Sequence, residues 1–255
     1  MRQLVLDFLY QKKSYGTQFF YSSGVDEGLA KFAETKGLPI DRIRDEKLFR
    51  ETFWKLCGEG LVCPGYNHSN QNLPHISITD YGIKCFEEGK ILPYDPEGFL
   101  NSLYANVKNI DDVIKMYFEE AVKCFIGRNY LSAVVMVGGA IEKTVIVLTE
   151  EIYKLIDIAE QPDYQKKILD QWKIKIKFDN LLKFLSEKGY KHKLGRTSQE
   201  KLDSTLPAIV NIVRITRNET GHPTGREVYR EEAEGEILLA KEGVIFMYKL
   251  LDELT

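Results

Sequence analysis

The second half of the chain, from about residue 100 onward, places apolar residues every three or four positions. This spacing is typical of α-helices that bury one face. The polar stretches between the stripes are short, and short loops join antiparallel neighbours in helical bundles. The pattern therefore predicts an all-helical bundle, with apolar stripes that begin at Val107, Tyr130, Ile168, Leu181, Leu202 and Ala233.

The first half mixes helical spacing with short alternating segments. Three helical stripes are followed by a strand, a polar loop and a returning strand that alternates apolar and polar residues. A last short helix completes this half. In order, the expected segments are Leu4–Leu9, Val25–Ala33, Leu48–Cys57, Leu61–Cys63, Pro64–Asn72, His75–Thr79 and Tyr81–Phe86.

This order of helices and strands resembles the winged helix-turn-helix fold. The resemblance is carried by FRETFWKLCGEGLVCPG, which begins at Phe49, and by LPHISITDYGIKCF, which begins at Leu73. Thr79 or Asp80 is expected to cap the last helix. The resemblance covers about residues 1–90 and implies a small helical domain with a β-hairpin.

Prolines and glycines concentrate between the two halves. The stretch Gly89–Gly98 holds two of each, and proline disfavours a helix immediately before it. The sequence therefore predicts two domains, residues 1–95 and residues 96–255, in a chain that is mainly α.

Composition indicates a folded globular protein, since 44% of the residues are hydrophobic and 29% are charged. The longest apolar run, around Val134–Val137, is interrupted by two glycines and then by Glu142 and Lys143. Asp7 falls where the apolar stretch of a signal peptide would have to lie. These observations predict no membrane segment and a cytoplasmic location.

The four cysteines, Cys57, Cys63, Cys85 and Cys124, are interpreted as reduced thiols because no secretion signal accompanies them. With nearby histidines, three of them could supply a zinc site, but their spacing matches no common zinc motif. The glycine motifs that bind nucleotides and dinucleotides are missing from the sequence. Neither a metal nor a cofactor is expected.

The net charge of −3 conceals a local asymmetry. Residues 165–201 carry eleven Lys and Arg against four Asp and Glu, whereas residues 226–255 carry four against eight. Two interpretations remain open for the basic segment. It is either an ordinary solvated helix face, as most charge runs are, or a surface that attracts phosphates.

A buried helical stripe that ends at Val213 runs into the sequence RNETGH, which begins at Arg217. Arg217 lies one helical turn after Val213, so a cation directly follows a buried face. Gly221 and Pro223 are expected to stop this helix and to hold His222 close to Arg217. The two side chains could then bind one anion together.

An arginine, a polar residue after it and a histidine beyond a four-residue spacer resemble the motif of the HEPN family. The preceding segment EEAVKCFIGRNYLSAVVMVGGAIEKTVIVL resembles the first helix pair of that family, with Glu142 where many members carry an acidic residue. The resemblance covers roughly residues 100–255. It implies a metal-independent endoribonuclease that cleaves RNA through the 2′-hydroxyl, as in toxins and phage-defence effectors, and that works as a homodimer through the C-terminal domain.

The resemblance also implies roles for individual residues. His222 would exchange protons, because histidine titrates near neutrality, and Arg217 would hold the phosphorane oxygens with its fixed fork of donors. Asn218 is expected to hold the phosphate or the imidazole, and Glu142 to orient Arg217.

RNA is expected to bind through cations near this motif. Lys173, Lys175 and Lys177 of the basic segment and Arg214 of the motif-bearing helix are the expected contacts.

Alternatives to the enzyme remain open. The C-terminal domain could act without catalysis, as part of a regulator whose winged-helix half binds DNA or a regulatory partner. A pure protein-interaction adaptor would need neither Arg217 nor His222, since an arginine near a helix C-terminus is favourable with the helix dipole alone.

Overall fold

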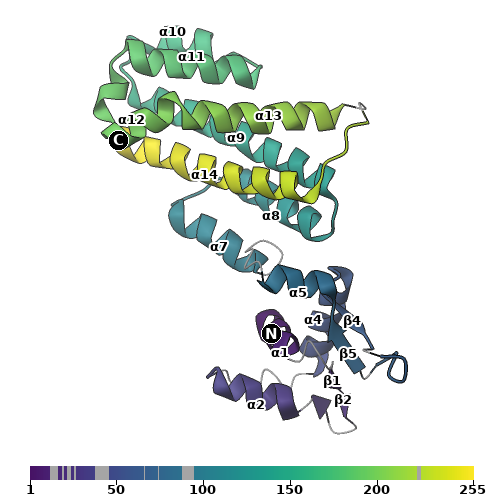
Figure 1. Cartoon of the computed structure of the whole chain (residues 1–255). Coiled ribbons are helices and arrows are strands. Elements are labelled where there is room, and N and C mark those ends of the chain that lie inside the picture. Colours follow the sequence, from purple (N-terminus) through teal and green to yellow (C-terminus); the bar gives the residue numbers. More distant parts are fainter. Residues whose placement is uncertain are drawn as a thin grey trace. The chain divides into compact units, whose positions relative to one another are not determined.

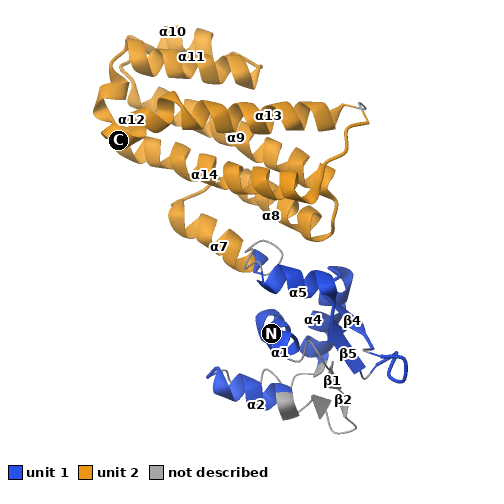
Figure 2. Ribbon diagram, in the orientation of Figure 1, with its two compact units in different colours: residues 1–96 blue, residues 97–255 orange. Residues whose placement is uncertain are grey.

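Helices make up most of the chain, which confirms the prediction of a mainly α protein. The computed structural model describes residues 1–255 except 12–16, 19, 22–23, 26, 38–45, 66, 74, 88–94 and 223–224. The chain divides into two units, unit 1 (Met1–Pro96) and unit 2 (Glu97–Thr255), which are shown in Figure 1 and Figure 2. The sequence placed the boundary after residue 95, in a proline- and glycine-rich stretch that lies largely outside the described residues.

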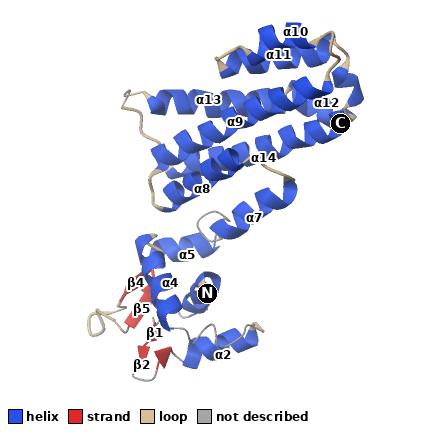
Figure 3. Cartoon of the chain, turned by 180° about the vertical axis from the view of Figure 1, so that it is seen from behind, coloured by secondary structure: helices blue, strands red, loops and turns tan. Residues whose placement is uncertain are grey.

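Unit 1 combines four described helices with short strands (Figure 3). Strands β4 (Val62–Pro64) and β5 (His75–Ile78) pair antiparallel with Cys63 opposite Ser77, which confirms the predicted hairpin to within one residue at each strand end. β1 (Thr17–Gln18) pairs with the other edge of β5, giving the strand order β1-β5-β4. The helices are α1 (Arg2–Gln11), α2 (Glu27–Thr35), α4 (Glu46–Gly58) and α5 (Asp80–Glu87).

The helical stripes of unit 1 supply its core. Phe49, Phe53 and Leu56 of α4 are fully buried, as their spacing predicted, and pack in one cluster with the apolar face of α1. Thr79 caps α5, since its hydroxyl accepts the N–H of Gly82 at 2.9 Å. The same hydroxyl donates to the Gly60 carbonyl at 2.7 Å, so the cap also ties α5 to the end of α4.

The prediction was wrong at the start of the second helix. Val25 does not belong to α2, which begins at Glu27, but to strand β3 (Gly24–Val25). β3 pairs with β2 (Phe20–Tyr21), with Val25 opposite Phe20. Strands of two residues are too short to show the alternation that identifies a strand in sequence, and Val favours either interpretation.

Unit 2 is a helical bundle built around its longest apolar helix, α9 (Tyr130–Leu155), whose bounds match the predicted stripe. α8, α13 and α14 pack against α9, and α11 contacts it as well. The other elements of unit 2 are α7 (Pro96–Asn106), α8 (Asp112–Ile126), α10 (Gln161–Tyr164), the π-helical turn η1 (Gln165–Leu169), α11 (Ile174–Glu187), the 3₁₀ turn η2 (Tyr190–Lys193), α12 (Arg196–Asp203), α13 (Thr205–Gly221) and α14 (Arg230–Leu254).

α9 is long and apolar enough to cross a membrane by length and composition, with a mean hydropathy of 1.9 over its most apolar window. The sequence-based exclusion of such a segment was therefore too strict. In the folded chain half of that window is buried, and α8, α13 and α14 surround the helix. Its position at the centre of unit 2 accounts for its apolar composition.

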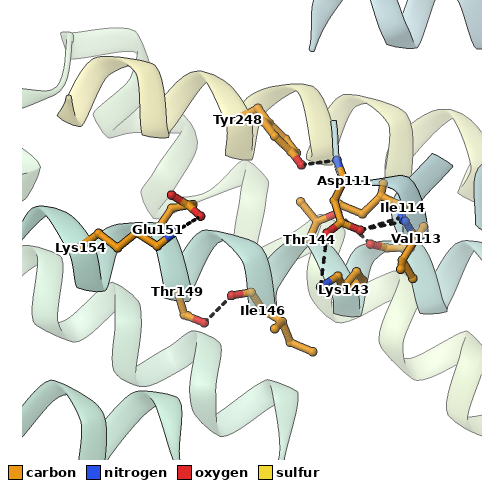
Figure 4. A network of polar contacts seen from close by, with 11 residues as sticks. Asp111, Val113, Ile114, Lys143, Thr144, Ile146, Thr149, Glu151, Lys154 and Tyr248 are labelled. Atoms are coloured by element: carbon orange, nitrogen blue, oxygen red, sulfur yellow. Dashed lines mark hydrogen bonds and ion pairs between the residues drawn. The ribbon is translucent and has the colours of Figure 1, made fainter. Parts of the chain in front are cut away.

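The first stripe of the second half begins in a turn, because Val107 and Ile110 precede α8 and only the later stripe residues are helical. α7 ends at Asn106, and Asp111 caps α8 by accepting the N–H of Val113 at 2.8 Å. The N–H of Asp111 donates to the Tyr248 hydroxyl at 3.0 Å, and the Asp111 carboxylate lies 3.4 Å from the Lys143 ammonium (Figure 4). One aspartate thus joins the start of α8 to α9 and α14.

Candidate functional site

Arg217 of α13 packs closely against Gly138 of α9. A β-carbon added at Gly138 of α9 would stand 2.5 Å from the Arg217 β-carbon and 2.4 Å from its γ-carbon. Only a residue without a side chain leaves room for the arginine stem at this point. Gly138 therefore sets the position from which the Arg217 guanidinium extends.

Glu142 follows Gly138 by one helical turn on the same face of α9, so it meets the guanidinium that the glycine admits. The Glu142 carboxylate and Arg217 Nη2 are 3.8 Å apart. Arg217 Nη1 donates to the Asn218 side-chain oxygen at 3.4 Å. Both separations exceed those of strong charge-assisted hydrogen bonds, so the five N–H donors of Arg217 retain capacity for an anion.

A pocket of about 330 Å³ opens beside Arg217. α9, α13 and the start of α11 form its walls, and these helices are far apart in the sequence. Four cationic side chains and one carboxylate line it, so its charge favours an anion. The lining residues are Glu142, Trp172, Lys173, Ile174, Lys175, Arg214, Arg217 and Asn218.

Arg214 strengthens this preference. It donates from Nη2 to the Asn211 side chain at 3.1 Å, whereas its buried Nε has no hydrogen-bond partner among the described residues. A buried donor without a partner costs free energy, roughly 1–3 kcal/mol or more for a charged group. The charge of Arg214, which lines the pocket, adds to the preference for an anion there.

The fold brings together six of the eight residues that the sequence singled out. Lys177 and His222 are the exceptions, because neither lines the pocket. α13 ends at Gly221, one of the two residues expected to stop it, and His222 follows as an exposed residue with extended backbone. Pro223, which was expected to help turn the chain here, lies outside the described residues.

The assignment of Lys177 to RNA binding was wrong. Lys177 is buried, and its ammonium donates to the carbonyls of Ile168 at 2.9 Å and Leu169 at 2.7 Å. Burial lowers the pKa of Lys177. These bonds join α11 to the end of η1, so the side chain stabilises the fold instead of facing a ligand.

Replacing Lys177 with methionine should lower the free energy of unfolding by about 1–3 kcal/mol, because two buried carbonyls lose their charged donor. Lys175→Met is the matched control. Among the described residues Lys175 pairs with Asp179 on the surface, so its loss should change stability by less than about 1 kcal/mol. Urea unfolding of both variants tests this, and equal losses would contradict the assignment.

The rest of the basic segment is mostly an ordinary solvated surface. Many of its cations pair with a nearby acid, as Lys191 does with Asp203 and Arg196 with Glu200. Lys201 lies instead over the Phe246 ring. Of the three lysines expected to contact RNA, Lys173 and Lys175 line the pocket.

Sequence reasoning missed Glu236, a buried carboxyl of α14 that faces α13. Burial raises the pKa of Glu236 to about 7, nearby Glu232 acts in the same direction, and a hydrogen bond with Thr216 and the charge of Arg226 oppose it. Glu236 Oε2 has no hydrogen-bond partner in the described part of the chain. Glu236 occupies an apolar-stripe position of α14, next to Ile237, which was the only signal in the sequence.

The raised pKa makes stability depend on pH. Below about pH 4.5 the Glu236 carboxyl is protonated in both the folded and the unfolded chain, so its burial does not lower the free energy of unfolding. Between about pH 4.5 and 7 the unfolded chain releases the proton first, and stability falls by up to roughly 3 kcal/mol. Glu236→Gln should therefore be more stable than the natural chain at about pH 8 and nearly equal at about pH 4. Denaturant unfolding at both pH values checks this, and exposed Glu242→Gln should show no such difference.

Trp172 also departs from the helical spacing of the sequence. It lies four residues after Ile168, where one apolar stripe was expected to begin, yet Ile168 is buried and Trp172 is 82% exposed at the pocket. The helix is interrupted between them, since η1 ends at Leu169 and α11 begins at Ile174. Apolar residues on the two sides of such a break do not lie on one face of a single helix.

Within the described ranges, no group of three or more His, Cys, Asp or Glu side chains is placed to hold a metal ion. All four cysteines are free thiols. In comparisons with protein-family models, curated proteins and solved structures, the chain matches none of them.

Proposed function

We propose that unit 2 is a metal-independent endoribonuclease of the HEPN type. The observation that carries the proposal is the pocket that joins Glu142 of α9, the lysines at the start of α11, and Arg214, Arg217 and Asn218 of α13. Residues from three helices meet there with a surplus of positive charge. Such a site suits a phosphate of a polyanion.

The chemistry requires an attack of the ribose 2′-hydroxyl on the adjacent phosphorus. The new P–O2′ bond forms as the P–O5′ bond breaks, the 2′ proton goes to a base and the leaving 5′-oxygen receives a proton. Arg217, oriented by Glu142, stabilises the charge on the phosphorane oxygens. The products are a 2′,3′-cyclic phosphate and a free 5′-hydroxyl, and no cofactor takes part.

His222 is the proposed proton carrier, because it is an exposed imidazole at the end of the helix that bears Arg217. It directly follows the last residue of α13, on extended backbone. In this proposal RNA bound in the pocket extends along α13 to reach His222, from the same protomer or from a partner.

A homodimer through unit 2 belongs to the proposal. Ile212 and Ile215 of α13 and Leu238 and Leu239 of α14 are exposed aliphatic residues on neighbouring helices. A second copy that covers them would bring two His222 side chains toward one interface. Light scattering at tens of micromolar should therefore report a dimer, and a monomer would remove this part of the proposal.

A non-catalytic nucleic-acid-binding protein is the second candidate. The placement of His222 outside the pocket favours it, because the pocket without a histidine binds an anion but lacks a group that titrates near neutrality. Such a protein would bind RNA through Arg214 and Arg217 and leave it intact.

For unit 1 we propose a winged-helix role in recognising a trigger or regulatory partner. Trp54 of α4 is 54% exposed and lines a pocket with Arg50, Phe53 and Leu73. A large exposed aromatic residue beside a cation is more typical of protein interfaces than of DNA-reading helices. With such a trigger the protein would act in the cytoplasm, as toxins and phage-defence effectors do.

Incubating the purified full chain with total RNA and mapping the new ends tests the proposal. The natural chain should produce defined cuts, and His222→Ala should reduce them by about 100-fold or more. Exposed His192 supplies a matched control, since His192→Ala should cleave normally. RNA that binds but stays intact would support the non-catalytic candidate, and RNA that neither binds nor breaks would contradict both.

A further inference from the structure

Trp172 is the most exposed tryptophan of the chain and stands at the pocket that holds Arg217. Burial of a tryptophan side chain stabilises a fold more than burial of most other side chains. An indole that is 82% exposed therefore suggests a binding role. The second tryptophan, Trp54, belongs to unit 1, so Trp172 has no counterpart in unit 2.

The backbone around Trp172 is held in place. The N–H of Asp170 donates to Gln165 at 2.9 Å, and the N–H of Gln171 donates to Ile168 at 3.2 Å. The buried ammonium of Lys177 binds the last carbonyls of η1 on the same side. The indole is therefore presented to solvent by a fixed turn.

The ring is flanked by positive charge. The Lys173 ammonium lies 5.2 Å from the centre of the indole ring, over one of its faces, and Lys175 and Arg214 line the same pocket. An aromatic face beside cations is the combination with which proteins bind single-stranded nucleic acids, because the cations hold the phosphates while the ring stacks on a base.

We propose that Trp172 stacks on an unpaired nucleobase next to the phosphate in the pocket, so that the site selects single-stranded over double-stranded RNA. Bases inside a duplex stack on one another and offer no face to the indole. This inference rests on the proposed function for the identity of the ligand, though it concerns binding and not cleavage. Stacking of one base contributes about 5- to 150-fold in affinity.

The test uses the full chain with Trp54→Phe, which leaves Trp172 as the only tryptophan. The ligand is a single-stranded 2′-O-methyl oligoadenylate, which lacks the nucleophilic hydroxyl and stays intact. It should quench the fluorescence of Trp172. A duplex of the same length and inorganic triphosphate, which carry phosphates without a free base face, should quench it far less.

Affinities then separate stacking from charge. Trp172→Ala should weaken binding of the single strand by about 5- to 150-fold and leave duplex binding unchanged, whereas Trp172→Phe should keep most of the affinity. Arg217→Ala should weaken binding of both ligands. If Trp172→Ala binds the single strand as the natural chain does, or if the duplex quenches equally, the stacking proposal is overturned. If Arg217→Ala also binds normally, the pocket is no RNA site and the proposed function fails with it.

Discussion

Replacing Arg217 with alanine is expected to slow RNA cleavage by about 100-fold or more, because Arg217 is the arginine that Glu142 orients toward the phosphorane oxygens in the proposed reaction. Arg214 and the two lysines would still bind RNA, although more weakly, and at saturating protein the remaining loss falls on the rate of the bound complex. Single-turnover cleavage at saturating protein measures this rate directly.

Arg196→Ala is the control for that measurement. Arg196 lies in the same unit, its side chain is 94% exposed, and its ion pair with Glu200 is on the surface. Its removal should change neither stability nor cleavage by a measurable amount. Equal rates for Arg217→Ala and the natural chain would show that the pocket does not perform the reaction.

Gly138→Ala should have an effect of similar size through a residue that touches no substrate. The added β-carbon would stand 2.4 Å from the Arg217 γ-carbon, so either the arginine stem moves or α9 and α13 separate. Cleavage should fall toward the level of Arg217→Ala, and the free energy of unfolding should drop by about 1–3 kcal/mol.

Two further variants identify the cause. Gly235→Ala changes a glycine of α14 that has open space around it, so it should cost nothing or stabilise the helix. Combining Gly138→Ala with Arg217→Gly removes both the β-carbon and the γ-carbon that the new methyl group meets. Apart from the cost of a glycine within the helix, which Arg217→Gly alone measures, the double variant should therefore recover most of the stability that Gly138→Ala loses. If the losses simply add, contact with Arg217 is not what makes Gly138 necessary.

Most of the fold could be predicted from helical periodicity, because a long amphipathic helix repeats its apolar spacing over many turns. α9 was predicted from one stripe with its bounds intact. Elements of two residues, such as β2 and β3, carry no repeat, so Val25 was assigned to the wrong element. The stripe that began at Val107 crossed the capped start of α8 for a related reason, since apolar residues continue across a short turn.

The candidate site was predictable where a sequence motif named its residues and less so where the packing of the helices decides a residue's role. Arg217, Asn218 and Glu142 could be named from sequence, but the close approach that makes Gly138 necessary depends on how α9 and α13 pack. Lys177 and Lys175 look alike in sequence, and only the carbonyls at the end of η1 distinguish them. For Trp172, a break between two helices decided its exposure.

The central claim is that unit 2 cleaves RNA through the 2′-hydroxyl at the Arg217 pocket. The most direct measurement replaces the ribose at a mapped cleavage position with 2′-deoxyribose and analyses the fragments by mass spectrometry in the presence of a chelator. The account predicts that the natural RNA gives a 2′,3′-cyclic phosphate end and that the substituted position is not cut. Cleavage at the 2′-deoxy position, or cleavage abolished by the chelator, would contradict it.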